Sequence, residues 1–208
     1  MRRICLCLAL GMILVWSGDA AAGCPIPLAG SYAFTGESGL ISAPDGFDTT
    51  KLTPLDDKVS YTSFSVQGIR IFNPDGTGSV QATEVETIVP APNSPSPPSP
   101  RAESQTFSYQ FTYTFSPNGA ISTTLVPGSY VGKILTGVRA GEYYTIDTLS
   151  LSGMVAADGL AMTLASTTTQ IETHTFYGSL TDLQKGQNAL DTEKVIAHRS
   201  RVLLFQSF

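Results

Sequence analysis

Side chains that could carry out acid–base or metal chemistry are few and scattered in this sequence. The two histidines, His174 and His198, lie far apart, with no H-x-H, H-E-x-x-H or paired-cysteine motif around them, so no metal site is predicted. The G-x-S-x-G motif of serine hydrolases is also missing. The sequence therefore assigns no catalytic residue, no metal ligand and no cofactor.

Carboxylates recur along stretches of alternating residues, for example Glu84, Glu86, Asp147 and Glu172. Two of them could share acid and base roles across a sheet, but no motif pairs them. We expect each to lie on a solvated outer face.

The segment HRSR near the carboxyl end is the densest polar cluster. If Ile196 and Val202 face the interior of the fold, alternation places His198 on the same face. His198 could then contact a ligand or accept a proton near neutral pH. Arg199 and Arg201 would lie on the opposite face, where they could hold an anion or pair with the surplus carboxylates.

Every second residue of the segment 107–115 is aromatic. Because the intervening residues are Ser, Gln and Thr, all five rings point to one face of a strand. Each large ring buries about 150–250 Å², so we expect them to fill a core or to line a cavity, which should reach about 300 Å³ if it binds a ligand. The predicted ligand-contacting residues are Phe107, Tyr109, Phe111, Tyr113, Phe115 and His198.

These residues belong to a chain of short alternating segments joined by turns. Asp75-Gly76, Asn118-Gly119 and Asp158-Gly159 predict tight hairpins, and only the segment 179–193 suggests a short helix. The pattern predicts an all-β fold, a single antiparallel β-barrel of about eight strands with hairpin connections; a two-sheet sandwich is the alternative. The expected strands are 30–36, 65–72, 79–89, 107–115, 142–155, 169–176 and 194–206, with others after the hairpin turns.

The first residues resemble an export signal rather than part of the fold. Two arginines precede an apolar run, and small residues follow it, which predicts a signal peptide at 1–22. We expect a periplasmic or extracellular protein with one domain over 23–208. Cys24 lies beside the predicted cleavage site, so a lipid anchor on that residue is the alternative.

The segment 90–100 holds 6 of the 13 prolines, which favours an exposed connector over a sheet strand. The alternative is a docking motif for a proline-binding partner. The chain has 12 basic against 17 acidic residues and a net charge of −5, so binding to nucleic acid is disfavoured. No stretch is long enough to span a membrane as a helix, and the oligomeric state stays open.

Several stretches resemble exported bacterial proteins with an allene oxide cyclase-like barrel, within the wider calycin group of lipocalin-type barrels. They include LAGSYAFTGESG, VQGIRIFNPDGTGSVQATE, YTFSPNGAISTTLVPGSYVGKILTG, TIDTLSLSGMVAADGLAMTLAS and IAHRSRVL. The resemblance implies a small antiparallel barrel with an internal cavity. It implies no cyclase reaction, because no stretch matches a cyclase active-site motif.

Three functions remain open. The chain could bind a small, largely apolar molecule inside the barrel, which is the function that we expect. It could instead act as a structural or interaction scaffold with a packed core, or as a cofactor-free isomerase or cyclase that uses His198.

Overall fold

The computed structural model describes residues 28–90 and 99–207. The predicted signal segment 1–22, Cys24 and residues 91–98 of the proline-rich segment lie outside this part of the chain.

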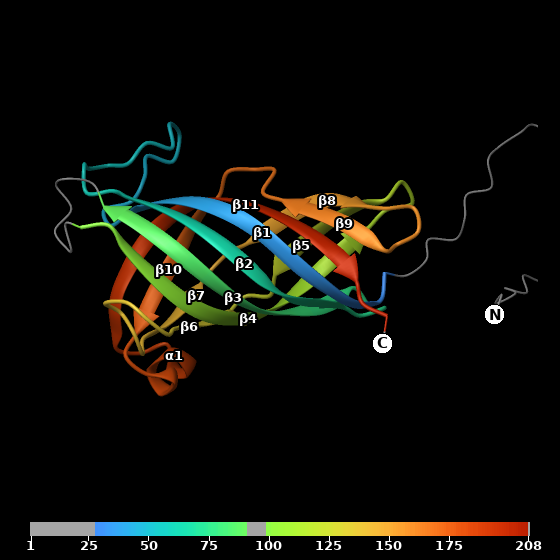
Figure 1. Cartoon of the computed structure of the whole chain (residues 1–208). Helices are drawn as coiled ribbons and strands as arrows, with labels where there is room; N and C mark the ends of the chain where they lie inside the picture. Colours follow the sequence, from blue (N-terminus) through green and yellow to red (C-terminus); the bar gives the residue numbers. More distant parts are fainter. Residues whose placement is uncertain (1–27, 91–98, 208) are drawn as a thin grey trace, which may run out of the picture.

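A single antiparallel sheet forms almost the whole fold (Figure 1). Strand β1 pairs with β2 on one side and with β11 on the other, so the sheet closes on itself. The all-β prediction is confirmed, and the pairing gives one closed sheet rather than the two sheets of a sandwich. Five long strands make most of the wall: β1 (Gly30–Ala43), β2 (Ser60–Phe72), β3 (Thr77–Pro90), β4 (Arg101–Phe115) and β11 (Ala189–Phe205).

Two sets of three short strands complete the wall between β4 and β11, one at each end of the molecule (Figure 1). The first set is β6 (Val131–Ile134), β7 (Tyr143–Ile146) and β10 (Ile171–Tyr177). The second set is β5 (Ala120–Leu125), β8 (Ser150–Val155) and β9 (Ala161–Ala165). Each set joins the five long strands in a closed ring of eight, so the expected strand number holds although the sheet contains eleven strands in the described residues.

The three predicted hairpin turns are confirmed. Gly76, Gly119 and Gly159 have φ angles of 85°, 88° and 72°, a region in which a side chain is strained. They connect β2 to β3, β4 to β5 and β8 to β9. In each turn the preceding Asp or Asn accepts a backbone N–H two residues further along, which explains the Asp-Gly and Asn-Gly pairs.

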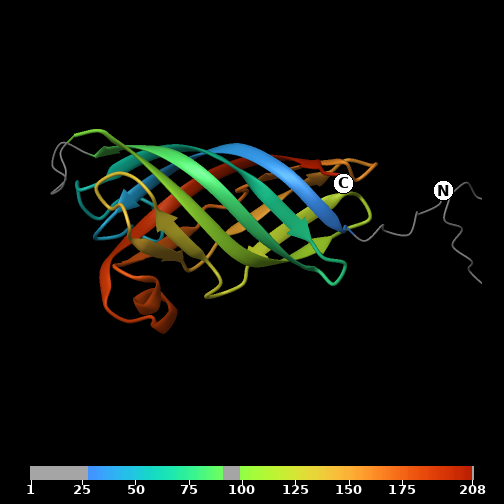
Figure 2. The same ribbon diagram turned by 60° about the horizontal axis from the view of Figure 1, so that its bottom comes forward.

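The segment 179–193 does contain a helix, α1 (Leu180–Lys185), which Figure 2 shows projecting from the end closed by β6, β7 and β10. Ser179 caps its first turn and Gly186, in the left-handed conformation, ends it. The segment 142–155 is two strands rather than the one expected, because β7 pairs with β10 whereas β8 pairs with β5. In the described part of the chain, no helix has the length and apolar character needed to cross a membrane.

The two ends of the interior differ. At the end closed by β5, β8 and β9, Phe72 packs edge-on against Tyr32 and Phe111, with ring centroids 5.5 and 5.2 Å apart. Tyr113 donates a hydrogen bond to the carbonyl of Leu28 at 2.5 Å, so the start of the described chain is held over this end. These rings fill this half of the interior, and the other half contains the cavity described next.

Candidate functional site

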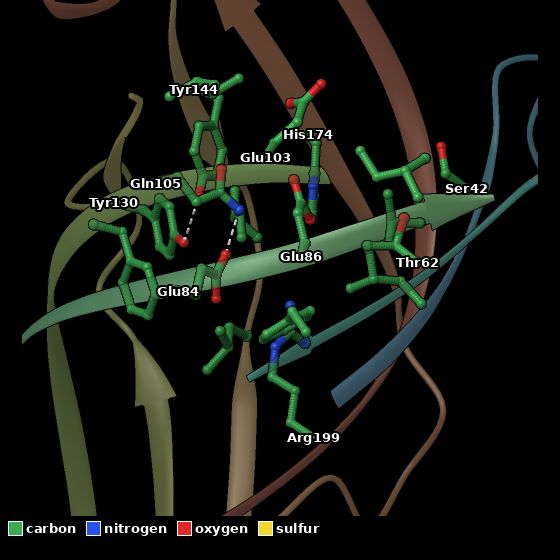
Figure 3. A pocket seen from close by; sticks show the side chains of 18 of the residues that line it. Ser42, Thr62, Glu84, Glu86, Glu103, Gln105, Tyr130, Tyr144, His174 and Arg199 are labelled. Carbon is green, nitrogen blue, oxygen red and sulfur yellow. Dashed lines mark hydrogen bonds between the residues drawn. The ribbon is translucent and has the colours of Figure 1, made fainter. Parts of the chain in front are cut away.

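An interior cavity of about 100 Å³ lies in the half of the ring closed by β6, β7 and β10. Side chains from the long strands and from these short strands point into it (Figure 3). Typical ligand pockets are about 300 Å³ or larger, whereas an apolar cavity of about 150 Å³ suffices for benzene. The space therefore falls short of the expected volume. In its present shape it suits only a molecule smaller than benzene, and a one-ring ligand would enter only if lining side chains move outward.

A stack of parallel rings forms one wall of this cavity. The Tyr130 ring lies 5.6 Å from Phe107 and 5.5 Å from Tyr109, with interplanar angles of 15° and 13°. The hydroxyl groups of Tyr130 and Tyr144 are 3.2 Å apart, and burial raises the pKa of both phenols well above the ordinary value. Both phenols are therefore neutral hydrogen-bonding groups at neutral pH.

The five aromatic residues predicted to share one face of a strand thus divide into two groups. All five rings pack against the core, but only Phe107 and Tyr109 line the cavity. Phe111, which is 1% exposed, belongs with Tyr113 and Phe115 to the filled half of the interior or its rim. Core filling and cavity lining therefore occur along the same strand.

The structure corrects the inward placement of His198. Its side chain is exposed on the outer face of β11 and borders a shallow surface hollow instead of the cavity. The odd-numbered residues of β11, such as Val195, Ala197 and Leu203, face the core, and not the even-numbered ones that include His198. Arg199 and Arg201 share their face and are therefore inside.

Buried carboxylates are the residues that sequence reasoning missed. Glu84 and Glu172 are only 7% and 2% exposed, and Glu86 also lines the cavity, whereas Asp147 is exposed as expected. The phase of β3 could have revealed two of them, because Glu84 and Glu86 alternate in register with core residues such as Val80.

A bidentate ion pair on the inner face of the sheet links the neighbouring strands β10 and β11. Arg199 donates from Nη1 and Nη2 to the two carboxylate oxygens of Glu172, with an Nη2–Oε2 distance of 2.7 Å. His174 Nε2 lies 3.2 Å from the same Oε2. Burial alone would raise the pKa of Glu172, but Arg199 and His174 outweigh it and hold that pKa at about 2.

Glu84 and Glu86 have the opposite electrostatic environment. Glu84 accepts a hydrogen bond from Gln105 Nε2 across the β3–β4 pair (Figure 3), and burial raises its pKa to about 7 although Arg201 and Arg199 oppose the shift. Glu86 faces Glu103 directly across the same pair. Burial, reinforced by Glu84 and Glu103, raises its pKa to about 8.

Two buried guanidinium groups lack a carboxylate partner. Arg201, 7% exposed, donates from Nη1 to the carbonyls of Glu37 and Ser200 and to the Ser38 hydroxyl. Arg70, 3% exposed, donates to the hydroxyls of Tyr109 and Thr123. In residues 28–90 and 99–207, neither lies within 4.0 Å of a carboxylate oxygen, whereas Arg199 pairs with Glu172 and Arg101 with Glu103.

The described residues contain no group of three or more His, Cys, Asp or Glu side chains arranged to hold a metal ion. Chemically, the site thus offers a flat aromatic wall, two carboxyl groups that titrate near neutrality, and guanidinium groups with hydrogen-bonding capacity to spare.

No protein-family model and no curated protein matches this chain. Among solved structures, the enduracididine biosynthesis enzyme MppR with HEPES buffer bound aligns at 10% identity and a TM-score of 0.20, covering 91% of this chain and 89% of that one. MppR complexed with pyruvate aligns at 10% identity and a TM-score of 0.18, covering 84% and 88%. Likeness at this level carries no argument about fold or function.

Proposed function

We propose that this protein binds one small molecule inside its closed sheet. The observation that carries the proposal is the interior cavity, which combines the stacked wall of Phe107, Tyr109 and Tyr130 with buried polar groups. A core that served stability alone would be expected to avoid buried charges, because they cost free energy unless they are fully paired.

The lining defines what kind of molecule would fit. The stacked rings favour a flat, apolar body. The same lining contains Arg201, Glu84 and Gln105, so a ligand without any polar group would leave these side chains unsatisfied. We therefore propose a ligand with a flat apolar body and one polar end, no larger than about one ring.

The binding experiment uses probes of two sizes. We expect 2-furamide or 2-furoate, each with one small ring, to shift the NMR resonances of the tyrosine rings in a saturable way. 2-Naphthamide should produce no shift, because a two-ring body exceeds the cavity by far more than a one-ring body does. A chain that binds none of the one-ring probes, or that binds 2-naphthamide equally well, contradicts the proposal.

A matched pair of variants locates the binding. Ile134, 2% exposed, lines the cavity, while its neighbour Leu135 is 47% exposed on the outside of the sheet. Ile134→Phe should fill the space and weaken binding by at least tenfold, and Leu135→Phe should leave it unchanged. Circular dichroism checks that both variants keep the β fold, since extra bulk in a packed interior costs about 1–3 kcal/mol.

A cofactor-free isomerase is a second candidate. Glu84 favours it, because a buried carboxyl with a pKa of about 7 beside a cavity suits proton transfer near neutral pH. His198 is on the outer face, so Glu84 would take the role expected of that histidine. Glu84→Gln should then abolish turnover of a ligand that the variant still binds.

The location outside the cytoplasm is also part of the proposal. It is supported by the signal-like pattern of residues 1–22 in the sequence. Mass spectrometry of the protein purified from its host should find a chain that begins at Gly23, or at a lipid-modified Cys24. A chain that retains Met1 or Arg2 contradicts it.

A further inference from the structure

We propose that Arg201 binds the carboxylate of a small organic acid in the interior cavity. This inference rests on the proposed function and names the chemical class of the ligand.

The hydrogen bonds of Arg201 leave one edge of its guanidinium group unused. All three are donated by Nη1, to the carbonyls of Glu37 and Ser200 at 3.0 and 2.8 Å and to Ser38 Oγ at 2.8 Å. Nε and Nη2 have no hydrogen-bond partner among the described residues. Their two N–H groups form the side edge of the fork, which matches the two oxygens of a carboxylate.

Positive charge exceeds negative charge around Arg201. Burial lowers the pKa of Arg201, and the nearby guanidinium groups of Arg199 and Arg70 lower it further, to about 10. Arg199 is neutralised by Glu172. Glu84, the remaining carboxyl group near Arg201, titrates only at about pH 7. An entering carboxylate would therefore supply the charge that this part of the interior lacks.

The backbone of β1 leaves space for the Arg201 side chain. Gly36 pairs with Arg201 across the β1–β11 register, and a Cβ at this position would lie 2.6 Å from Arg201 Cδ and closer still to the Ser200 carbonyl. Any other residue at Gly36 would displace the arginine. The inward position of Arg201 thus depends on a glycine that β-strand preference alone would disfavour.

The neighbouring rings favour an organic acid over an inorganic anion. Arg201 and the stack of Phe107, Tyr109 and Tyr130 line the same cavity. An inorganic phosphate or sulfate would satisfy the guanidinium but would place its remaining oxygens against aromatic carbon without hydrogen bonds. A flat acid such as 2-furoate presents a carboxylate to Arg201 and a ring to the stack.

The test compares 2-furoate with 2-furamide, which has nearly the same shape but no charge, by NMR titration at pH 7.5. For the wild-type chain we expect 2-furoate to bind at least tenfold more tightly. Arg201→Met should remove this preference while changing the affinity for 2-furamide less than threefold. Lys133→Met, which removes an exposed charge on the outer face of β6, should leave the preference intact.

A measurement on the wild-type chain keeps the test valid if Arg201→Met does not fold. The ¹⁵N–¹H resonance of Arg201 Nε should shift with 2-furoate and not with 2-furamide, because only the carboxylate accepts from both free N–H groups.

The outcomes separate the two proposals. If neither probe binds, the proposed function fails and this inference fails with it. Two other outcomes leave the small-molecule site standing and overturn the assignment of a carboxylate ligand. In the first, 2-furamide binds as tightly as 2-furoate. In the second, 10 mM phosphate displaces labelled 2-furoate as well as 10 mM unlabelled 2-furoate does.

Discussion

Arg199 and Glu172 form a buried bidentate pair, with Nη2 and Oε2 2.7 Å apart and both side chains almost fully removed from solvent. Each residue lies on a different strand, β11 and β10, so the pair ties these two neighbouring strands together on the inner face of the sheet. A buried pair of this kind adds little net stability over apolar residues, but the loss of one partner leaves an uncompensated charge.

Glu172→Gln should therefore lower the free energy of unfolding by about 3–5 kcal/mol. The amide keeps the shape of the carboxylate, so the loss reports the unpaired charge on Arg199 and not a cavity. Urea unfolding followed by circular dichroism measures the change. Glu37→Gln, which alters an exposed carboxylate on β1, serves as the control and should stay within about 0.5 kcal/mol of the wild type.

The same pair predicts sensitivity to acid. The pKa of Glu172 is about 2 in the folded chain and near its ordinary value in the unfolded chain, so the unfolded state binds the proton first as the pH falls. The stability that Glu172 contributes is present above about pH 4.5 and is lost progressively towards pH 2. Unfolding curves between pH 6 and pH 2 should show a smaller loss for Glu172→Gln, and equal losses in both chains would contradict the assignment.

Glu86 predicts the opposite pH dependence. Its pKa of about 8 in the folded chain means that the folded state keeps a proton that the unfolded state has released. Its contribution is fully present below about pH 4.5 and is lost as the pH rises through 8. Glu86→Gln should therefore make the chain more stable than the wild type at pH 9, by about 1–3 kcal/mol, and the gain should shrink at pH 5. Differential scanning calorimetry at both pH values provides the measurement.

Gly36 and Gly39 on β1 provide a steric test. Gly36→Ala should destabilise the chain by about 1–3 kcal/mol, because the new Cβ would lie 2.6 Å from Arg201 Cδ and would also press on the Ser200 carbonyl. Gly39 faces outward, and a Cβ there meets its nearest heavy atom, the Thr62 carbonyl oxygen, only at 3.9 Å. Gly39→Ala should be neutral or slightly stabilising; similar losses in both variants would show that space around Arg201 is not the cause.

The two histidines should behave differently on substitution. His198→Ala should change stability by less than about 0.5 kcal/mol, because the side chain is exposed. His174→Ala should cost about 1–3 kcal/mol, since it removes a buried ring that lies 3.2 Å from Glu172 Oε2 and stacks on Tyr144. Thermal unfolding measures both, and a larger effect at His198 would contradict its outward placement.

Local sequence patterns were reliable wherever one residue type decides the backbone conformation. The Asp-Gly and Asn-Gly turns follow from positive φ angles that glycine adopts without strain. The five aromatic residues of β4 share a face because side chains alternate in every strand.

Alternation alone could not say which face of a strand is inside. In β11, both faces carry apolar residues, for example Leu203 inside and Leu204 outside, and Leu204 is 59% exposed. Val202, another apolar residue on the outer face, is 49% exposed. The apolar pattern was therefore ambiguous, and the arginines looked like surface residues because buried charges are rare in proteins. The allene oxide cyclase-like resemblance stays a prediction.

The hairpin turns, the antiparallel class and the grouping of side chains on each strand were determined by the sequence itself, because they depend on residues close together in the chain. Closure of the ring, the phase of β11, the division of 142–155 into two strands and the close approach of Arg201 to Gly36 were decided only by the tertiary structure. The physical reason is that a buried charge is tolerated only through partners on other strands, and the pattern within one strand does not contain that information.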